Sequence, residues 1–350
     1  MALAWSTRYE SRSDRANDPR TANFLRHVSK GGTKMKTMIT GGAGFIGSHL
    51  VDGLIQRGHD VCVLDDFSTG KEENLDSALR GGALVVRADV RESEQVADAV
   101  VSFEPEVIFH LAAQMNVRNS VADPAFDART NIEGTINVLE AARRVDARVI
   151  NVSTGGAMYG DTNIVPTPES VEPLPEAPYG QSKYCAERYV ALYTRLFGLR
   201  GATVRLGNVY GPRQDPFGEA GVVAIFCGHL QDRQRPTIYG TGRQTRDYVY
   251  ISDVIAGLLA VLDHPEVHGE YNIGTGRASS VLDIIEALEP YANGDFAPIL
   301  AEARAGEIER SCLDVTRAGT ELGWSAQVDL ADGLHHTANW TKVDRVPVAG

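Results

Sequence analysis

The stretch 36-KTMITGGAGFIGSHL-50 decides the fold, because it joins a short β-rich run to a helical pattern through a glycine-rich turn. Gly41, Gly44 and Gly47 form the spacing G-x-x-G-x-x-G, and an apolar helical pattern follows them. Such a turn brings backbone N–H groups at a helix N-terminus to a pyrophosphate. The stretch therefore predicts a dinucleotide-binding turn near the start of a βαβ unit.

Beyond this turn, β-rich runs alternate with helical patterns as far as about residue 180, which is typical of a parallel sheet with helices on both faces. The further runs are 61-VCVLD-65, 84-LVVRA-88, 107-VIFHL-111 and 148-RVINVS-153. Loops rich in proline and glycine become frequent after that point, which indicates a smaller unit built around a ligand.

We therefore predict an α/β fold with a Rossmann-type doubly wound parallel sheet and a smaller α/β C-terminal substrate domain. The sheet is expected in a dinucleotide-binding domain at 35–205, with some later segments returning to it. A second, ligand-binding domain is expected mainly at 206–342. Residues 1–34 are predicted to be a disordered extension, and 343–350 a tail.

Composition narrows the function. The chain has 350 residues, of which 43% are hydrophobic and 23% charged, as in soluble globular proteins, and its net charge of −12 argues against a nucleic-acid partner. No apolar run reaches the roughly 18 residues that span a membrane, and 254-VIAGLLAVL-262 suits a buried helix. The four cysteines are far apart and share no metal-ligand spacing with the histidines. We therefore expect free thiols, a cytoplasmic location and no metal site.

Carboxylates after the second and third β-rich runs point to the cofactor. Asp65 and Asp66 lie about 20 residues beyond the glycines, where a carboxylate accepts hydrogen bonds from a ribose diol and repels a 2′-phosphate. NAD is therefore favoured over NADP. Asp89 is placed to meet the adenine, and the small residues of 110-HLAAQ-114 leave room for a dinucleotide.

Tyr179 and Lys183, in 178-PYGQSK-183, share one helix face at i, i+4. The pair can be interpreted in two ways: as exposed residues on a helix surface, or as catalytic residues in which the lysine helps the tyrosine to ionise. A tyrosine pKa is near 10 and a general base works best near 7, so a base requires roughly 4 kcal/mol of preferential phenolate stabilisation. A nearby ammonium and a positively charged nicotinamide can supply it. The segment 151-NVSTGGAMYG-160 offers a hydroxyl that could share the proton.

Taken together with 208-NVYGPR-213, these motifs resemble those of the extended short-chain dehydrogenase/reductases, and most closely the UDP-glucose 4-epimerase-like nucleotide-sugar epimerases. The resemblance covers about residues 35–342 and implies that the domain at 35–205 binds NAD and that the domain at 206–342 mainly binds a nucleotide sugar. It implies that Tyr179 removes a proton from the sugar 4-OH while hydride moves to NAD. The 4-keto sugar then rotates and receives the hydride on its other face. Lys183 also holds the nicotinamide ribose, and NAD stays bound.

The catalytic hydroxyl departs from the family pattern. Aligned on Tyr159, the chain has Gly155 where many epimerases carry serine or threonine. We predict Thr154 as the functional hydroxyl, with Ser153 as the alternative.

The resemblance also implies two sets of binding residues. Those expected at the cofactor are Gly41, Gly44, Phe45, Ile46, Gly47, Asp65, Asp66, Ser68, Thr69, Gly70, Asp89, Val90, Leu111, Ala112, Ala113, Gln114, Asn131, Ser153, Tyr179 and Lys183. Asn131 could also cap a helix. Those expected at the nucleotide sugar are Thr154, Tyr179, Asn208, Val222, Val223, Thr237, Tyr239, Arg246, Arg304 and Glu307. The arginines would hold the diphosphate against the negative net charge.

Several alternatives stay open. The favoured substrates are UDP-glucose and UDP-galactose, but a small Ser311 leaves room for an acetamido group, and Arg213 is a conceivable partner for a uronic acid. UDP-N-acetylglucosamine, UDP-glucuronate and dTDP-sugars are therefore alternatives. A 4,6-dehydratase would carry an Asp-Glu pair after Thr154, where this chain has two glycines. A silent NAD-binding regulator would tend to lose the Tyr–Lys pair.

The resemblance implies a homodimer as well. Residues 122–144 and 179–198 would pack with their mates into a four-helix bundle.

Overall fold

A computed structural model describes residues 33–216, 221–303 and 308–344 of the chain. Its centre is a seven-stranded sheet in the order β10-β6-β5-β4-β1-β2-β3, and every neighbouring pair in it is parallel. The strands are β1 (Lys36–Thr40), β2 (Asp60–Asp65), β3 (Leu84–Arg87), β4 (Val107–His110), β5 (Arg148–Thr154), β6 (Gly201–Leu206) and β10 (Gly269–Ile273). The first five confirm the strands predicted from the sequence.

Helices cover both faces of this sheet. On one face lie α2 (Phe45–Gln56) and α10 (Ile251–Asp263), and on the other α4 (Ser93–Phe103), α7 (Gly134–Arg144) and α8 (Pro178–Phe197). Adjacent strand residues alternate between the two cores: Ile39 belongs to the α2–α10 core, whereas Met38 belongs to the opposite one. Buried on both faces, the strands carry apolar runs without strict alternation.

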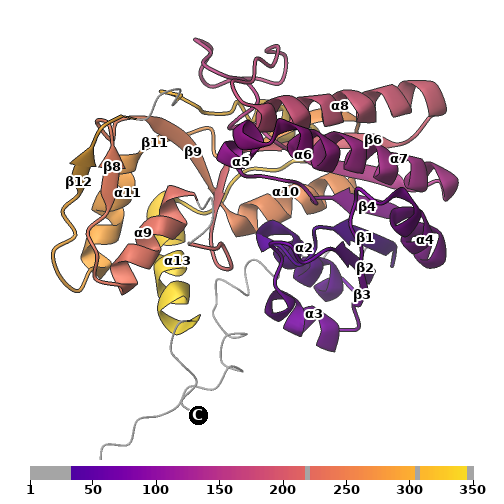
Figure 1. Ribbon diagram of the computed structural model, residues 1–350, viewed down its shortest axis with the longest axis horizontal. Helices are drawn as coiled ribbons and strands as arrows, with labels where there is room; N and C mark the ends of the chain where they lie inside the picture. Colours follow the sequence, from indigo (N-terminus) through magenta and orange to yellow (C-terminus); the bar gives the residue numbers. More distant parts are fainter. Residues whose placement is uncertain (1–32, 217–220, 304–307, 345–350) are drawn as a thin grey trace, which may run out of the picture.

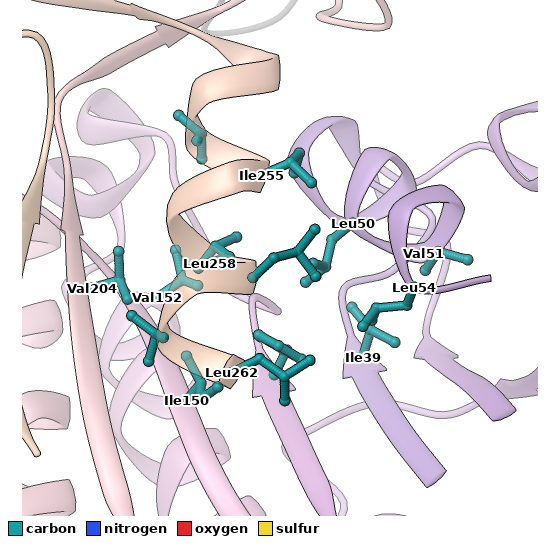
Figure 2. Packing of buried hydrophobic residues seen from close by; sticks show 14 of the residues in the cluster. Ile39, Leu50, Val51, Leu54, Ile150, Val152, Val204, Ile255, Leu258 and Leu262 are labelled. Atoms are coloured by element: carbon teal, nitrogen blue, oxygen red, sulfur yellow. The ribbon is translucent and has the colours of Figure 1, made fainter. Parts of the chain in front are cut away.

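Figure 2 shows how the α2–α10 core is filled. Leu50 and Leu54 of α2 lie opposite Ile255 and Leu258 of α10, above the side chains of the strands. Leu50, Leu54 and Leu258 are fully buried, and each such side chain contributes about 1.5–3 kcal/mol through burial. This packing holds α2, and with it the glycine turn at its start, in a fixed position. The buried helix predicted at 254–262 is confirmed as part of α10.

A smaller part has its own core and its own two sheets (Figure 1). One sheet has the order β11-β9-β7 and the other pairs β12 with β8. The strands are β7 (Asn208–Tyr210), β8 (Thr237–Tyr239), β9 (Thr245–Tyr250), β11 (Ala278–Ser280) and β12 (Ile299–Ala301). Helices α9 (Val222–Gln231), α11 (Val281–Leu288) and α13 (Leu330–Asp344) pack around them. The predicted fold class is confirmed.

Short helices complete the two parts: η2 (Glu72–Leu75), α3 (Asp76–Arg80), α5 (Val117–Ala122), α6 (Pro124–Ala128), η4 (Glu289–Tyr291) and α12 (Thr316–Leu322). Between α6 and α7 the chain forms a π-helix, η3 (Arg129–Glu133). The segment predicted at 122–144 therefore starts after Asp123, whose side chain accepts a hydrogen bond from the Phe126 N–H, and widens at η3. Within the described part of the chain, none of the helices has the length and apolar character needed to cross a membrane.

Candidate active site

The glycine turn lies at the carboxyl edge of the sheet, between β1 and α2. Gly41 has φ +70°, and a Cβ there would lie 2.7 Å from the Ala112 nitrogen. A Cβ on Gly47 would lie 2.2 Å from the Gly41 oxygen. Both positions therefore require glycine. No side chain caps the N-terminus of α2, and its first turn, with Phe45 and Ile46, has no acidic residue, which leaves the turn suited to an anion.

The two aspartates after β2 differ in their roles. Asp65 is buried, and its two oxygens accept hydrogen bonds from the Ala43 and Phe67 N–H groups, each at 2.8 Å. It thereby ties the glycine turn to the loop that holds Ser68, Thr69 and Gly70. Asp66 is exposed and accepts hydrogen bonds from the Ser68 N–H and hydroxyl. Carboxylate oxygens have further lone pairs, so both aspartates can still accept from a ribose.

Asp89 forms hydrogen bonds with the nearby Arg91 side chain. The Arg91 Nε lies 3.0 and 2.9 Å from the two Asp89 oxygens, and these hydrogen bonds hold the pKa of Asp89 below its usual value. The Arg91 guanidinium in turn lies over the Phe126 ring, 4.9 Å from its centroid. The neighbouring Val90 is in the core. A contact of Asp89 with adenine stays a prediction.

Asn131 connects the loop after β4 to α8. Its side chain accepts from the Gln114 N–H at 2.8 Å and donates to the Gln114 carbonyl at 2.9 Å and to the Ser182 hydroxyl at 2.9 Å. It lies inside η3, so the helix-cap role considered from the sequence is wrong. Asn131 thus fixes the segment that runs from Leu111 through Ala112 and Ala113 to Gln114.

Thr154 and Tyr179 meet at the end of β5. The Thr154 hydroxyl opposes the rise in the pKa of Tyr179 that burial causes, and the Thr154 Oγ1 accepts a hydrogen bond from the Ala157 N–H at 3.2 Å. With that oxygen accepting from Ala157, the Thr154 proton is free to turn toward a tyrosine oxygen, where it would favour the phenolate. Ser153, one residue earlier, is buried, and its hydroxyl has no hydrogen-bond partner among the described residues. Of the two candidate hydroxyls, Thr154 is the one that acts on the pKa of Tyr179.

Lys183 lies buried one turn after Tyr179. Burial lowers its pKa to about 8, while the nearby carboxylates of Glu187 and Asp127 act in the opposite direction. Desolvation raises the pKa of Tyr179 to about 12, which the Thr154 hydrogen bond opposes and the Asp127 charge reinforces. The surrounding protein groups therefore shift the tyrosine away from ionisation. A further positive charge beside the phenol is required to make it a base near neutral pH.

Two residues from later in the chain, Asn208 and Leu313, lie against the turn that follows Thr154. Asn208 begins β7, and its Oδ1 is buried without a hydrogen-bond partner among the described residues. A Cβ on Gly156 would lie 3.1 Å from this oxygen. A Cβ on Gly155 would lie 2.6 Å from the Leu313 side chain, so Leu313 occupies the space that a residue larger than glycine would need there. A serine or threonine at position 155 would therefore require Leu313 to move.

The remaining predicted substrate residues occupy the second part. Thr237 and Tyr239 bound β8, and Arg246 of β9 donates to the Thr245 carbonyl at 2.9 Å. Val222 opens α9 half-buried, whereas the Val223 side chain is in the core, which leaves only its backbone for a ligand. Arg304 and Glu307 lie outside the described residues, as do most of the predicted extension and tail.

Two residues beneath the site were missed from the sequence. His110 is buried, with Nδ1 2.8 Å from the Thr40 hydroxyl and Nε2 3.0 Å from the Thr135 hydroxyl, and burial lowers its pKa to about 3. Asp127 is buried beside Lys183, and its Oδ1 accepts from the Gln114 Nε2 at 2.8 Å. A signal was present in both cases: the histidine ends a strand at the carboxyl edge, and Asp127 precedes Asn131 by one helical turn.

This geometry agrees with comparisons to known proteins. The sequence model of the NAD dependent epimerase/dehydratase family matches residues 37–274. The chain belongs to this family. Three similar proteins cover nearly the whole of the described chain. UDP-glucose 4-epimerase of Mycolicibacterium smegmatis is 42% identical over 308 residues, which are 87% of this chain and 98% of that protein.

Two solved structures extend the comparison with the epimerase/dehydratase family. UDP-glucose 4-epimerase of Thermotoga maritima with UDP-glucose is 41% identical, with a TM-score of 0.85, and the match covers 89% of this chain and 99% of that one. UDP-glucose 4-epimerase of Thermus thermophilus in complex with NAD is 38% identical, with a TM-score of 0.82, and the match covers 88% and 99%. The predicted family, fold and cofactor are confirmed.

The residues present fit NAD, the cofactor of this epimerase/dehydratase family. The glycine turn leaves no room for a Cβ at Gly41 or Gly47, and an exposed carboxylate, Asp66, lies beside it, where a 2′-phosphate would be repelled. Tyr179 and Lys183 stand at the same edge of the sheet. We expect these residues to hold the pyrophosphate, the ribose and the nicotinamide half, respectively.

Proposed function

We propose that this protein is an NAD-dependent UDP-sugar 4-epimerase that interconverts UDP-glucose and UDP-galactose. The observation that carries the proposal is the grouping of Thr154, Tyr179 and Lys183 near a glycine pair and the Asn208 Oδ1, which has no hydrogen-bond partner among the described residues. A family member with this site can remove a proton from a sugar hydroxyl. The 42% identity to a UDP-glucose 4-epimerase supports the choice of sugar.

The residues divide the chemistry between them. The Tyr179 phenolate takes the proton of the sugar 4-OH and becomes a neutral phenol, and Thr154 donates a hydrogen bond that stabilises the phenolate before this transfer. Lys183, one helical turn after Tyr179, is proposed to hold the nicotinamide ribose and to add positive charge there. NAD, when bound, accepts and returns the hydride and brings the further positive charge that the tyrosine requires. Asn208 and Arg246 are proposed to hold the nucleotide diphosphate, together with Arg304 and Glu307.

The space around the turn favours an epimerase over a dehydratase. Elimination would need carboxylates after Thr154, yet the two positions hold glycines whose Cβ sites face Leu313 and Asn208 at 2.6 and 3.1 Å. No larger side chain fits at Gly155 without moving Leu313. The uronic acid alternative is also weakened, because Arg213 pairs with Asp52 at 2.6 Å. An acetamido sugar stays open, since Ser311 is small and half-buried.

The substrate can be identified with purified protein and no added cofactor. We expect C4 epimers from UDP-glucose, followed by NMR, and little or no product from UDP-N-acetylglucosamine, UDP-glucuronate or dTDP-glucose. Epimerisation of another sugar in this set would change the proposed substrate and would still support a 4-epimerase. A 4-keto-6-deoxy product would show a dehydratase, and no turnover even with NAD supplied would contradict the proposal.

Changing the two hydroxyls separately identifies the one that acts in catalysis. Thr154→Val removes the hydrogen bond proposed to stabilise the Tyr179 phenolate, so we expect turnover to fall about tenfold or more. Ser153→Ala is the comparison variant: its hydroxyl has no partner among the described residues and is expected at the cofactor, so the change should weaken NAD retention and lower turnover less than Thr154→Val does. Initial rates of both variants at saturating substrate decide the point, and a larger loss in Ser153→Ala would reverse the assignment.

We also propose that the protein is a cytoplasmic homodimer. The four cysteines are free, as suits a reducing compartment. Near the end of α8, one of the two helices expected at the interface, Leu196 and Phe197 are exposed by 60% and 51%. Light scattering that shows a monomer at micromolar concentration would contradict the dimer.

A further inference from the structure

The helix that begins at the glycine turn also contacts the substrate side of the molecule. His49 and Asp52 lie on one face of α2, three residues apart. The His49 Nε2 is 3.0 Å from the Pro212 carbonyl, and the Arg213 Nη2 is 2.6 Å from the Asp52 Oδ2. A carbonyl only accepts, so His49 carries its proton on Nε2. Two consecutive loop residues are thus bonded to one helix.

The loop adopts a costly conformation to make these contacts. Arg213 has φ +67°, a region that residues other than glycine seldom adopt. The ion pair is largely shielded, with exposed fractions of 22% for Arg213 and 17% for Asp52. The second guanidinium nitrogen, Nη1, is buried and without a hydrogen-bond partner among the described residues. Strain and incomplete bonding persist where the surrounding structure enforces them, and they often mark functional positions.

The same loop is fixed to β7. Gln214 donates to the Val209 carbonyl at 3.2 Å, and a Cβ on Gly211 would lie 2.6 Å from the Ile251 side chain. Asn208, the proposed substrate contact, begins β7 only a few residues before Arg213. The loop therefore has little freedom to move independently of Asn208. A displacement of α2 would be transmitted to β7.

We propose that His49, Asp52, Pro212 and Arg213 form a latch that couples cofactor binding at the start of α2 to nucleotide-sugar binding at β7. Asp52 and Arg213 are then positioning residues and do not contact either ligand. The inference rests on the proposed function, since it assumes that Asn208 belongs to the nucleotide-sugar site. Coupling of this kind is reciprocal: each ligand strengthens the binding of the other by the same factor.

The test measures UDP affinity by calorimetry in the full-length protein, once loaded with NAD and once stripped of it. In the wild type we expect UDP to bind more tightly to the loaded form, within the range of about 5–150-fold that is usual for coupled sites. In Asp52→Asn and in Arg213→Gln this ratio should fall towards one, and the double variant should lose no more than either single change. Arg213→Lys keeps the charge and should retain part of the coupling, which tests the latch even if a neutral variant folds poorly.

A matched control uses an ion pair at the C-terminal end of α2. Arg57, the C-cap of α2, bonds Asp263 of α10 at 2.9 Å, away from the loop, so Asp263→Asn should leave the ratio unchanged. An equal loss of UDP affinity in the loaded and stripped forms of Arg213→Gln would show that Arg213 contacts UDP directly and would overturn the latch. A wild type that binds UDP equally in both states overturns the latch alone. A wild type that binds no UDP in either state overturns both the latch and the proposed function.

Discussion

Tyr179→Phe should lower the turnover of UDP-glucose by about 10²–10⁴-fold, the usual contribution of a positioned general base. The substitution removes only the phenol hydroxyl, so the ring continues to fill its place and NAD should remain bound. Turnover by NMR and retained NAD by absorbance after gel filtration are measured on the same sample. A variant that keeps turnover above one tenth of the wild-type value would exclude Tyr179 as the base.

The same helix supplies a control. Tyr184 lies on α8 with its hydroxyl 2.7 Å from the exposed Glu172 carboxylate, outside the Tyr179–Lys183 pair. Tyr184→Phe should leave turnover close to that of the wild type. A comparable loss in both variants would point to damage of the helix and not to lost base catalysis.

The pH dependence should follow from the raised pKa of Tyr179. A pKa of about 12 means that only a small fraction of the tyrosine is ionised at neutral pH in the absence of further positive charge. Turnover should therefore rise as pH increases, up to the pKa that the tyrosine has in the loaded enzyme. In Tyr179→Phe the residual rate should lose this rise.

Gly47→Ala should abolish the retention of NAD. Its Cβ would lie 2.2 Å from the Gly41 oxygen and 2.8 Å from the Gly42 Cα, both backbone atoms that cannot rotate away. The glycine turn must open, and overpacking of this kind costs about 1–3 kcal/mol or more, which is about fivefold to 150-fold or more in affinity if it falls on the bound state. Calorimetry with NAD on the purified variant measures this loss.

Gly53→Ala is the control in the same helix. The added Cβ would meet only side-chain atoms, the nearest 3.3 Å away in Ile255, and alanine favours helix by about 1 kcal/mol. We expect this variant to retain NAD with unchanged or higher thermal stability. Equal loss of NAD in both variants would mean that any substitution in α2 disturbs the site, and the specific role of Gly47 would be refuted.

The sequence was most informative about local structure. The five predicted strands and the glycine turn could be read from short patterns, since strand, turn and helix each depend on neighbouring residues. The choice between Ser153 and Thr154 could not be made from such patterns. Adjacent strand residues point to opposite faces, and a strand buried on both sides shows no alternation that marks the catalytic face.

Long-range contacts could not be predicted from the sequence, for a different reason. Asp127 approaches Lys183 only because α6 and η3 pack on α8, and Arg213 meets Asp52 across 161 residues. Arg213 was considered as a partner for a sugar carboxylate, and its ion pair shows instead a contact with α2. The exclusion of larger side chains from position 155 likewise depends on Leu313, which no local pattern indicates.

Return of the chain to the main sheet limits how the protein can be re-engineered. After β7 and β9, the segment 251–273 supplies α10 and β10 to the large sheet, and Ala318, Leu322 and Trp324 join the same core later. Figure 1 shows α10 among the elements from the first half of the chain. A graft that exchanges the specificity-bearing part for that of another enzyme therefore needs three separate inserts, at about 207–250, 274–315 and 325–344. A single crossover near residue 206 would also exchange the edge strand β10 and the helix α10 that packs on α2.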